Sequence, residues 1–367
     1  MIDIVKIKER IFMTLKKLFT KRFVLIMIIL TVLLMGMAII SLCLGQYSLA
    51  IKDVFNILIS GPNGAAVKAA EGGEFSANAV KVVYNIRIPR ILLSIIAGAG
   101  LSVAGAAFQA VFSNPLATPD TIGVSNAASF GAALAILFGM PVIIMQLVSA
   151  GFGILAVLLV FFICSLSTDK EKNTISSDFS INVILSGIVI SSLFSALVSF
   201  IKYIADPLDK LPAITFWLMG SFSAATTKKL LFCAPFIIAG IYVITLLRYK
   251  LNILSLGDEE AVSLGLRIKR VRLIIIASAA LITAAVVSTC GLIGWCGLII
   301  PHLSRLLTGS DNKRVIPLSI VLGGMFMLIS DTLARCLTRA EIPVSIITAV
   351  IGAPVFIVLL IRSRRAF

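Results

Sequence analysis

The chain has 367 residues, of which 59% are hydrophobic and 13% are charged, and its mean hydropathy is +1.09. A soluble domain would have about a quarter of its residues charged, so this composition argues against a soluble protein and indicates a membrane protein. The net charge of +15 would suggest nucleic acid if it lay on a soluble surface, but the basic residues fall between apolar segments. We therefore expect that the chain is surrounded by membrane lipid and has no nucleic-acid partner.

A basic tail precedes the first apolar segment. Residues 1–22 carry seven Lys and Arg residues, and 23–44 is a run of 22 residues without a charge. This run is longer than the apolar core of a signal peptide, and no small-residue cleavage site follows it. We therefore expect a first membrane helix that runs outward from a cytoplasmic tail, with residues 23–367 forming one transmembrane domain.

The next part of the chain is expected to lie outside and then to return through the membrane. Residues 45–86 form the predicted external segment, and a second helix begins near Arg90 and runs inward through 91–112. Residues 121–168 are 48 uncharged residues, broken by Gly-Met-Pro at 139–141. A run of this length with a glycine and a proline in it predicts two helices joined by an external turn.

The second half of the chain continues as a series of apolar segments. The segment 213–224 is too short to cross a bilayer, so we expect a re-entrant or partial helix there. The run 273–304 exceeds one span and contains glycines and a proline, which predicts one helix and the start of a short one. Further helices are expected at 181–203, 229–247, 316–337 and 343–361. The fold class is therefore all-α, a polytopic membrane protein of about ten spans.

The distribution of basic residues predicts the orientation of the chain. Of the 32 Lys and Arg residues, 20 lie in five segments between or beside the apolar runs. These segments are 1–22, 167–180, 248–272, 313–314 and 362–365. Cytoplasmic loops carry an excess of Lys and Arg, so this pattern places both termini in the cytoplasm.

The charged segment 248–272 separates two long uncharged runs. Its leucine and isoleucine residues before Gly257 recur at near-helical spacing, and residues 258–264 follow, with three acids in their first turn, before Gly265. Acids at a helix N-terminus and a glycine after its end are typical helix boundaries. We therefore expect two short helices with glycine joints in this cytoplasmic loop, forming a surface that another protein can hold.

The cysteines and the histidine are the residues to consider for a metal or redox site. The six cysteines are scattered through apolar segments without a C-x-x-C pair, so we assign no disulfide and no metal to them. His302 is the single histidine, and one imidazole cannot form a zinc site without other ligands. Because it follows Pro301, we expect it to hydrogen-bond backbone groups freed by a helix break. Asp331 and Arg335 are four residues apart, and we expect them to pair on one helix.

Two segments carry denser motifs than hydropathy explains. The first reads R-I-P-R at 87–90, continues through Gly98 and Gly105, and reaches N-P-L-A-T-P at 114–119. The second contains, in order, G-L-I-I-P-H-L-S-R at 297–305, G-S-D at 309–311, D-T-L-A-R at 331–335, E-I-P-V at 341–344 and G-A-P-V-F at 352–356. Gly and Pro are common in membrane helices, so the order of the motifs is more informative than any single motif.

Structural roles explain several of these residues. The glycines at 98 and 105 indicate close contacts between helices, because small residues let helix backbones approach. Asn114, Pro115 and Pro119 are expected to shape the turn between the second and third helices.

Together with L-G-D-E-E-A-V-S-L-G at 256–265, these motifs resemble the FecCD-type permeases of iron-siderophore, haem and cobalamin ABC importers. The resemblance runs from about residue 45 to the end of the chain, in order and without a large gap. It implies a second permease subunit around a central path, two cytoplasmic ATPase subunits and an extracellular or periplasmic substrate-binding protein. ATP and magnesium would then bind the ATPase, and we expect no cofactor in this chain, which lacks G-x-x-x-x-G-K-[ST].

The resemblance also assigns roles to particular residues. Arg87, Arg90 and Arg335 match arginines that pair with glutamates of the binding protein at the outer mouth, and the predicted topology places them there too. Snorkelling would also keep arginines at helix ends without a partner, and it stays the alternative. The residues that match the ATPase-docking element are Leu256, Gly257, Ala261, Leu264 and Gly265.

We therefore expect the transmembrane permease subunit of an ABC importer in a bacterial plasma membrane, which carries iron-siderophore complexes. Haem and cobalamin are the alternative cargoes, and the chain itself is not expected to be an enzyme. An ion-coupled secondary transporter is the alternative from another class. Such a transporter would usually need carboxylates buried within the membrane, and Asp331 is the nearest example.

Overall fold

The computed structural model describes residues 2–47, 49–70, 76–166 and 177–363, and every regular element in these ranges is a helix. The first half contains α1 (Ile2–Cys43), α2 (Ile51–Ala70), α3 (Ala77–Lys81), the π-helix η1 (Val82–Arg87), α4 (Ile88–Val111), the 3-10 helix η2 (Pro119–Ile122), α5 (Val124–Leu137) and α6 (Val142–Leu166). The second half contains α7 (Ser177–Ile204), α8 (Lys210–Leu218), α9 (Thr227–Leu254), α10 (Asp258–Ser263), α11 (Ile268–Cys290), α12 (Cys296–Thr308), α13 (Asn312–Cys336) and α14 (Val344–Ser363).

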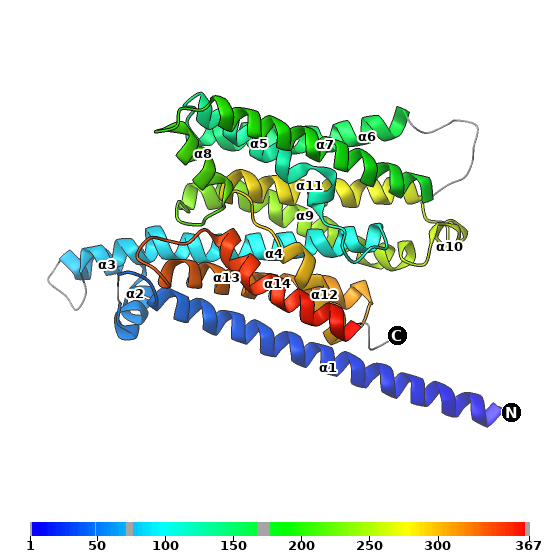
Figure 1. Cartoon of the computed structure of the whole chain (residues 1–367). Helices are drawn as coiled ribbons and strands as arrows, with labels where there is room; N and C mark the ends of the chain where they lie inside the picture. The colour runs from blue at the N-terminus through cyan, green and yellow to red at the C-terminus, as the bar shows by residue number, and fades with distance from the viewer. Residues whose placement is uncertain (1, 48, 71–75, 167–176, 364–367) are drawn as a thin grey trace.

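The long helices lie side by side and form one elongated bundle (Figure 1). α10 lies at one end of the bundle, where α1 begins and α14 ends, and α2, α3 and α8 lie at the opposite end. We call these two ends the α10 end and the arginine end. The arginine end is named for Arg87, Arg90 and Arg335, which gather there around the end of α1 and the end of α13.

Seven helical segments among the described residues are long and apolar enough to cross a membrane, which supports a polytopic, all-α protein. They lie in α1, α3 to α4, α6, α7, α9, α11 and α13. Two shorter apolar helices, Val124–Leu137 and Val344–Leu359, add to these. The predicted total of about ten spans would also need α12, which has 13 residues, so that total stays a prediction.

The predicted helix breaks lie where glycine and proline indicated them. α5 ends and α6 begins around Gly139, which has φ +66°, and α11 and α12 are separated by a break that starts at Gly291, with φ +75°. Trp295 closes this second break with φ 69°, a conformation that bulky residues rarely adopt. α8 has nine residues, which is too short for a span and agrees with a partial helix in the predicted segment 213–224.

The predicted start of the second helix is wrong. Residues 77–86, which were expected in the external segment 45–86, are helical and continue through Arg87 into α4, giving a helical stretch of 35 residues. No glycine or proline interrupts 77–87, and the π-helical turn η1 bridges it to α4. Arg87 and Arg90 therefore lie within this stretch and not at its start. α1 likewise includes residues 2–22, the predicted basic tail.

α4 lies at the centre of the bundle, and 83% of the most apolar residues of the stretch Ala77–Val111 are buried. A side chain added at Gly98 would meet the carbonyl of Gly323 on α13, and one added at Gly105 would meet the backbone of Gly297 on α12. Both glycines therefore let helix backbones lie in contact. Ser102, between them, donates a hydrogen bond of 2.7 Å to the Ser319 carbonyl of α13. α4, α12 and α13 form a tightly joined core.

Candidate functional site

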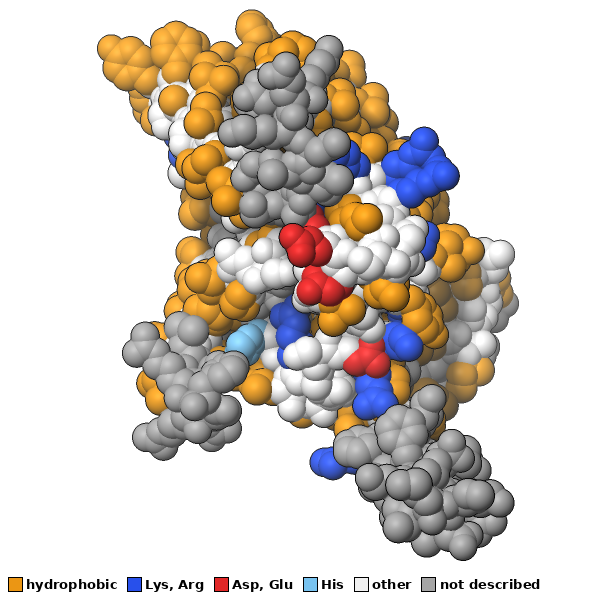
Figure 2. Space-filling view, turned by 90° about the vertical axis from the view of Figure 1, so that its right-hand side faces the viewer, with side chains coloured by type: hydrophobic (Ala, Val, Ile, Leu, Met, Phe, Trp, Pro, Cys, Tyr) orange, Lys and Arg blue, Asp and Glu red, His pale blue; other side chains and the backbone are white. Residues whose placement is uncertain are grey.

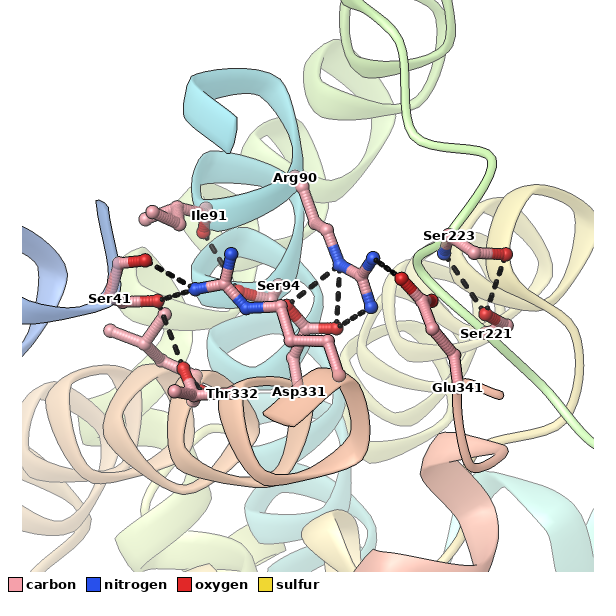
Figure 3. Close-up of polar contacts among 11 residues, drawn as sticks. Ser41, Arg90, Ile91, Ser94, Ser221, Ser223, Asp331, Thr332 and Glu341 are labelled. Carbon is pink, nitrogen blue, oxygen red and sulfur yellow. Dashed lines mark hydrogen bonds and ion pairs between the residues drawn. The ribbon is translucent and has the colours of Figure 1, made fainter. Parts of the chain in front are cut away.

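At the arginine end, Arg90 holds two acids from different parts of the chain (Figure 3). Its Nε lies 3.0 and 3.1 Å from the two carboxylate oxygens of Asp331, and its Nη2 lies 2.8 Å from Oδ1 of that residue. Its Nη1 donates to Glu341 Oε1 at 2.8 Å. Asp331 is fully buried, whereas the Glu341 side chain is 32% exposed. The two acids compensate a buried cation and join α4, α13 and the loop before α14.

Arg335 and Arg87 bind the last turn of α1. The Arg335 Nη2 donates to both the carbonyl and the hydroxyl of Ser41, and the Arg87 Nη1 donates to the carbonyls of Leu42 and Cys43 (Figure 3 shows the Ser41 contacts). The final carbonyls of a helix have no partner within the helix, and cations are favourable at this end of its dipole. These two arginines therefore cap α1 and attach it to α4 and α13.

The structure brings the three predicted docking arginines together, but it buries them. Arg87, Arg90 and Arg335 are 3%, 4% and 5% exposed, and all three bind groups of this chain. Snorkelling would keep their charged heads in water, so the burial of these three arginines argues against that alternative, and docking stays a prediction. The predicted pair of Asp331 with Arg335 is wrong: among the described residues Asp331 pairs with Arg90, because Arg335 turns toward α1. Glu341 had no role in the sequence prediction, although it begins the E-I-P-V motif.

At the α10 end, one of the two predicted short helices is absent. Residues 251–254 continue α9, since no glycine or proline interrupts the chain before Gly257, which has φ +123°. The second predicted helix is α10, which is followed by Gly265 with φ +77°. Arg272 on α11 donates two hydrogen bonds of 2.6 and 2.8 Å to Asp258 on α10, and both side chains are less than a tenth exposed. This buried ion pair fixes α10 against α11.

α10 and its flanks present apolar side chains to the surface. Leu256, Val262 and Leu264 are 63%, 48% and 62% exposed, whereas Ala261 is fully buried beneath them. Figure 2 shows this end of the molecule, where acidic and basic side chains lie among hydrophobic ones. Of the five residues predicted to dock an ATPase, Leu256 and Leu264 are therefore available for direct contact. Ala261 positions the helix from within, and Gly257 and Gly265 form the turns at its two ends.

His302 does not make the backbone hydrogen bond that we expected. Its Nε2 is buried and has no hydrogen-bond partner among the described residues. Arg305, one turn later on α12, donates to Oε1 of Gln109 on α4, which sequence analysis had not connected with α12. The amide nitrogen of Gln109 lies 3.3 and 3.4 Å from two carbonyls of α12. The group thus adds polar contacts between α4 and α12.

Asn114, Pro115 and Pro119 lie in the connection between α4 and α5, as the motif indicated. The Asn114 side chain accepts a hydrogen bond of 2.9 Å from the backbone N–H of Leu116, and its carbonyl accepts one from Ala117. This pattern is an Asx-turn, which asparagine favours. Pro119 begins the 3-10 helix η2 that leads to α5.

Comparison with known proteins identifies relatives along nearly the whole chain. Residues 30–362 match the model of the FecCD transport family. The molybdate import system permease protein MolB of Haemophilus influenzae is 38% identical over 92% of this chain and 95% of its own length. A probable iron chelatin transport system permease protein of Helicobacter pylori is 32% identical over 89% and 95% of the two chains. A solved structure, titled as an inward-facing conformation of a putative metal-chelate type ABC transporter, has a TM-score of 0.80 at 38% identity and covers 92% of this chain and 99% of that one.

Proposed function

Because the chain belongs to the FecCD transport family, it is an integral membrane permease of an ABC transporter, and we propose that it is the import subunit of an ATP-driven uptake system. In this proposal two permease subunits, identical or related, enclose the path of the cargo. Two ATPase subunits bind on the cytoplasmic side, and a substrate-binding protein docks outside. The observation that carries the proposal is the apolar surface at α10, because the chain has no phosphate-binding motif of its own and needs a partner to use ATP.

We place the ATPase at the α10 end. Leu256 and Leu264 would insert into a groove of the ATPase, and the turns at Gly257 and Gly265 would set the angle of α10. Ala261 would keep α10 flat against the bundle. This end would then face the cytoplasm together with the start of α1 and the end of α14, which agrees with the positive-inside distribution of the sequence.

We place the binding protein at the arginine end, which would face outward. The burial of the arginines restricts how this docking can occur. Nε and Nη2 of Arg90 donate to Asp331, and Nη1 donates to Glu341. Of these two acids, Glu341 is partly exposed and Asp331 is buried. A carboxylate of the binding protein would therefore reach Arg90 by displacing Glu341. Arg87 and Arg335 would act through α1, whose end they hold.

The proposed cargo is a metal taken up as a complex or an oxyanion. Iron-siderophore is the predicted cargo, and relatives named for iron chelates, Fe(3+)-citrate, hemin and cobalamin support a metal complex. Molybdate is the second candidate, because the relative named for molybdate is 38% identical, against 32% and 34% for those named for iron chelatin and Fe(3+)-citrate.

The experiment is uptake into proteoliposomes that contain the permease and its ATPase, with the binding protein added outside. ATP-dependent accumulation of a radiolabelled iron-siderophore, but not of molybdate, would support the predicted cargo, and the reverse would replace it. Uptake that needs an ion gradient and no ATP would contradict the proposal and favour a secondary transporter. That alternative has little support in the structure, because the buried carboxylate of Asp331 is already paired with Arg90.

A further inference from the structure

The last turn of α9 carries an asparagine that joins it to α13. Asn252 donates from Nδ2 to Asp311 Oδ1 at 2.6 Å, and its Oδ1 accepts from the backbone N–H of Asn312 at 2.8 Å. Asp311 is the N-cap of α13, and the same carboxylate oxygen accepts from the backbone N–H of Lys313 at 3.0 Å. Asp311 thus caps the N–H of Lys313, whereas the N–H of Asn312 finds its acceptor on Asn252 of another helix, so the two bonds of Asn252 join α9 to the start of α13.

The structure around Asn252 fixes both sides of this joint. Leu251 and Leu254, on the same turn, are 0% and 1% exposed and hold the end of α9 in the core. One turn earlier, the ring of Tyr249 lies 4.5 Å from the ammonium group of Lys313, which adds a cation–π contact between the same two helix ends. Because the Asn252 amide is used as donor and as acceptor at once, it sets one position of α9 relative to α13.

Asn252 connects the α10 end to α13, the helix that extends to the arginine end. Only residues 255–257 separate α9 from α10. α13 begins beside Asn252 and extends about 36 Å at 1.5 Å per residue to the arginine end (Figure 1). There it carries Asp331, which holds Arg90. Along its length it is pressed against α4, where Gly98 and Gly323 bring the two backbones into contact.

We propose that Asn252 is the positioning residue that passes a movement of α10 to α13. This inference rests on the proposed function, in which an ATPase holds α10. When the ATPase displaces α10, the end of α9 follows, and the two hydrogen bonds of Asn252 carry the start of α13 with it. Without them α9 can shift while α13 stays in place, so that ATP hydrolysis no longer changes the arginine end.

The test uses the complete complex of permease, ATPase and binding protein in proteoliposomes. Asn252→Leu removes both hydrogen bonds at similar volume, and Asn252→Asp places a carboxylate against Asp311. Both variants should keep the basal rate of ATP hydrolysis and lower the amount of cargo transported per ATP by roughly tenfold, the effect of losing a hydrogen bond to a charged group. Ser165→Ala is the matched control, because among the described residues this exposed hydroxyl on α6 donates to the backbone of its own helix and lies outside α10 and α13, and it should change nothing.

The double variant Asn252→Asp/Asp311→Asn restores one donor and one acceptor across the joint, and asparagine remains a good N-cap. It should recover most of the transport per ATP, and it decides the matter even if Asn252→Leu fails to fold. Normal transport per ATP in Asn252→Leu or Asn252→Asp would overturn the inference, as would a double variant that regains thermal stability without regaining coupling. A wild-type complex whose ATP hydrolysis the binding protein does not stimulate would instead contradict the proposed function.

Discussion

Replacing Glu341 with glutamine is expected to strengthen the docking of a binding protein. In the free permease, Nη1 of Arg90 is occupied by Glu341 at 2.8 Å, and Asp331 occupies Nε and Nη2. A carboxylate of the partner must therefore compete with Glu341 for Arg90. Glutamine keeps the size of this side chain and removes its charge, so Glu341→Gln makes the position easier to take.

The size of the effect follows from the contact and its exposure. A hydrogen bond between charged groups contributes about 1.5–3 kcal/mol, and exposure of a third of the Glu341 side chain reduces this to about 1 kcal/mol through solvent screening. This corresponds to a dissociation constant about fivefold lower in the variant. The free energy of unfolding should fall by no more than about 1 kcal/mol, because Asp331 still compensates Arg90. Asp331→Asn should cost about 3 kcal/mol, since it leaves a buried cation without its main partner.

The assay is the affinity of detergent-purified permease complex for the binding protein, measured by surface plasmon resonance at two salt concentrations. Asp209→Asn is the matched control, because this acid is the N-cap of α8, a helix of the arginine end, and its side chain is 74% exposed, with Oδ2 3.2 Å from Lys210 Nζ. If Glu341→Gln binds with wild-type affinity while Arg90→Glu binds more weakly, the binding protein docks at this end without displacing Glu341. Salt-insensitive binding that is unchanged in Arg90→Glu would refute docking at this end.

Three further predictions concern helix contacts and the α10 surface. Gly105→Leu should lower the melting temperature or prevent folding, because its side chain would meet the backbone of Gly297; a thermal unfolding curve like that of the wild type would contradict this contact. Gly265→Val should reduce ATP hydrolysis stimulated by the binding protein while the permease still inserts. The reason is that a β-branched residue at φ +77° is strained by about 1–2 kcal/mol. Normal uptake in this variant would contradict the role of the turn. Arg272→Met should destabilise the packing of α10 by about 3 kcal/mol, because it leaves Asp258 buried without its cation. Hydrogen exchange of the α10 amides should become faster, and the double variant Arg272→Met/Asp258→Leu should partly reverse this effect.

Local signals in the sequence predicted most of the helices. The breaks at Gly139 and Gly291 could be found because a left-handed backbone conformation favours glycine, and α10 could be found from the acids of its first turn. The same reasoning misplaced the end of α9. Leu251 and Leu254 were interpreted as a separate short helix, yet both are buried in the core and belong to one uninterrupted helix. Hydropathy could not show this, because the segment is also charged.

The pairing of charges could not be predicted in the same way. The spacing of Asp331 and Arg335 favours a pair on one helix, but Arg90, distant in sequence, is better placed for Asp331. Arg335 instead donates to the carbonyl and the hydroxyl of Ser41 in the last turn of α1. Which cation meets which acid depends on how α1, α4 and α13 pack, and this is a tertiary property. The motif containing Glu341 was visible in the sequence, whereas its contact with Arg90 was not.

The attachment of α1 has a consequence for the biogenesis of the protein. None of the most apolar residues of α1 is buried against the rest of the chain, and the contacts of α1 with the core are concentrated in its last turns, near Leu42. A chain without α1 would therefore keep the core of α4, α12 and α13, but Arg87 and Arg335 would lose the carbonyls that receive their hydrogen bonds. During insertion, α1 can wait in the lipid as an independent helix until α13 has been synthesised. Once α1 packs against α13, its last carbonyls accept the hydrogen bonds of Arg87 and Arg335 and complete the arginine end.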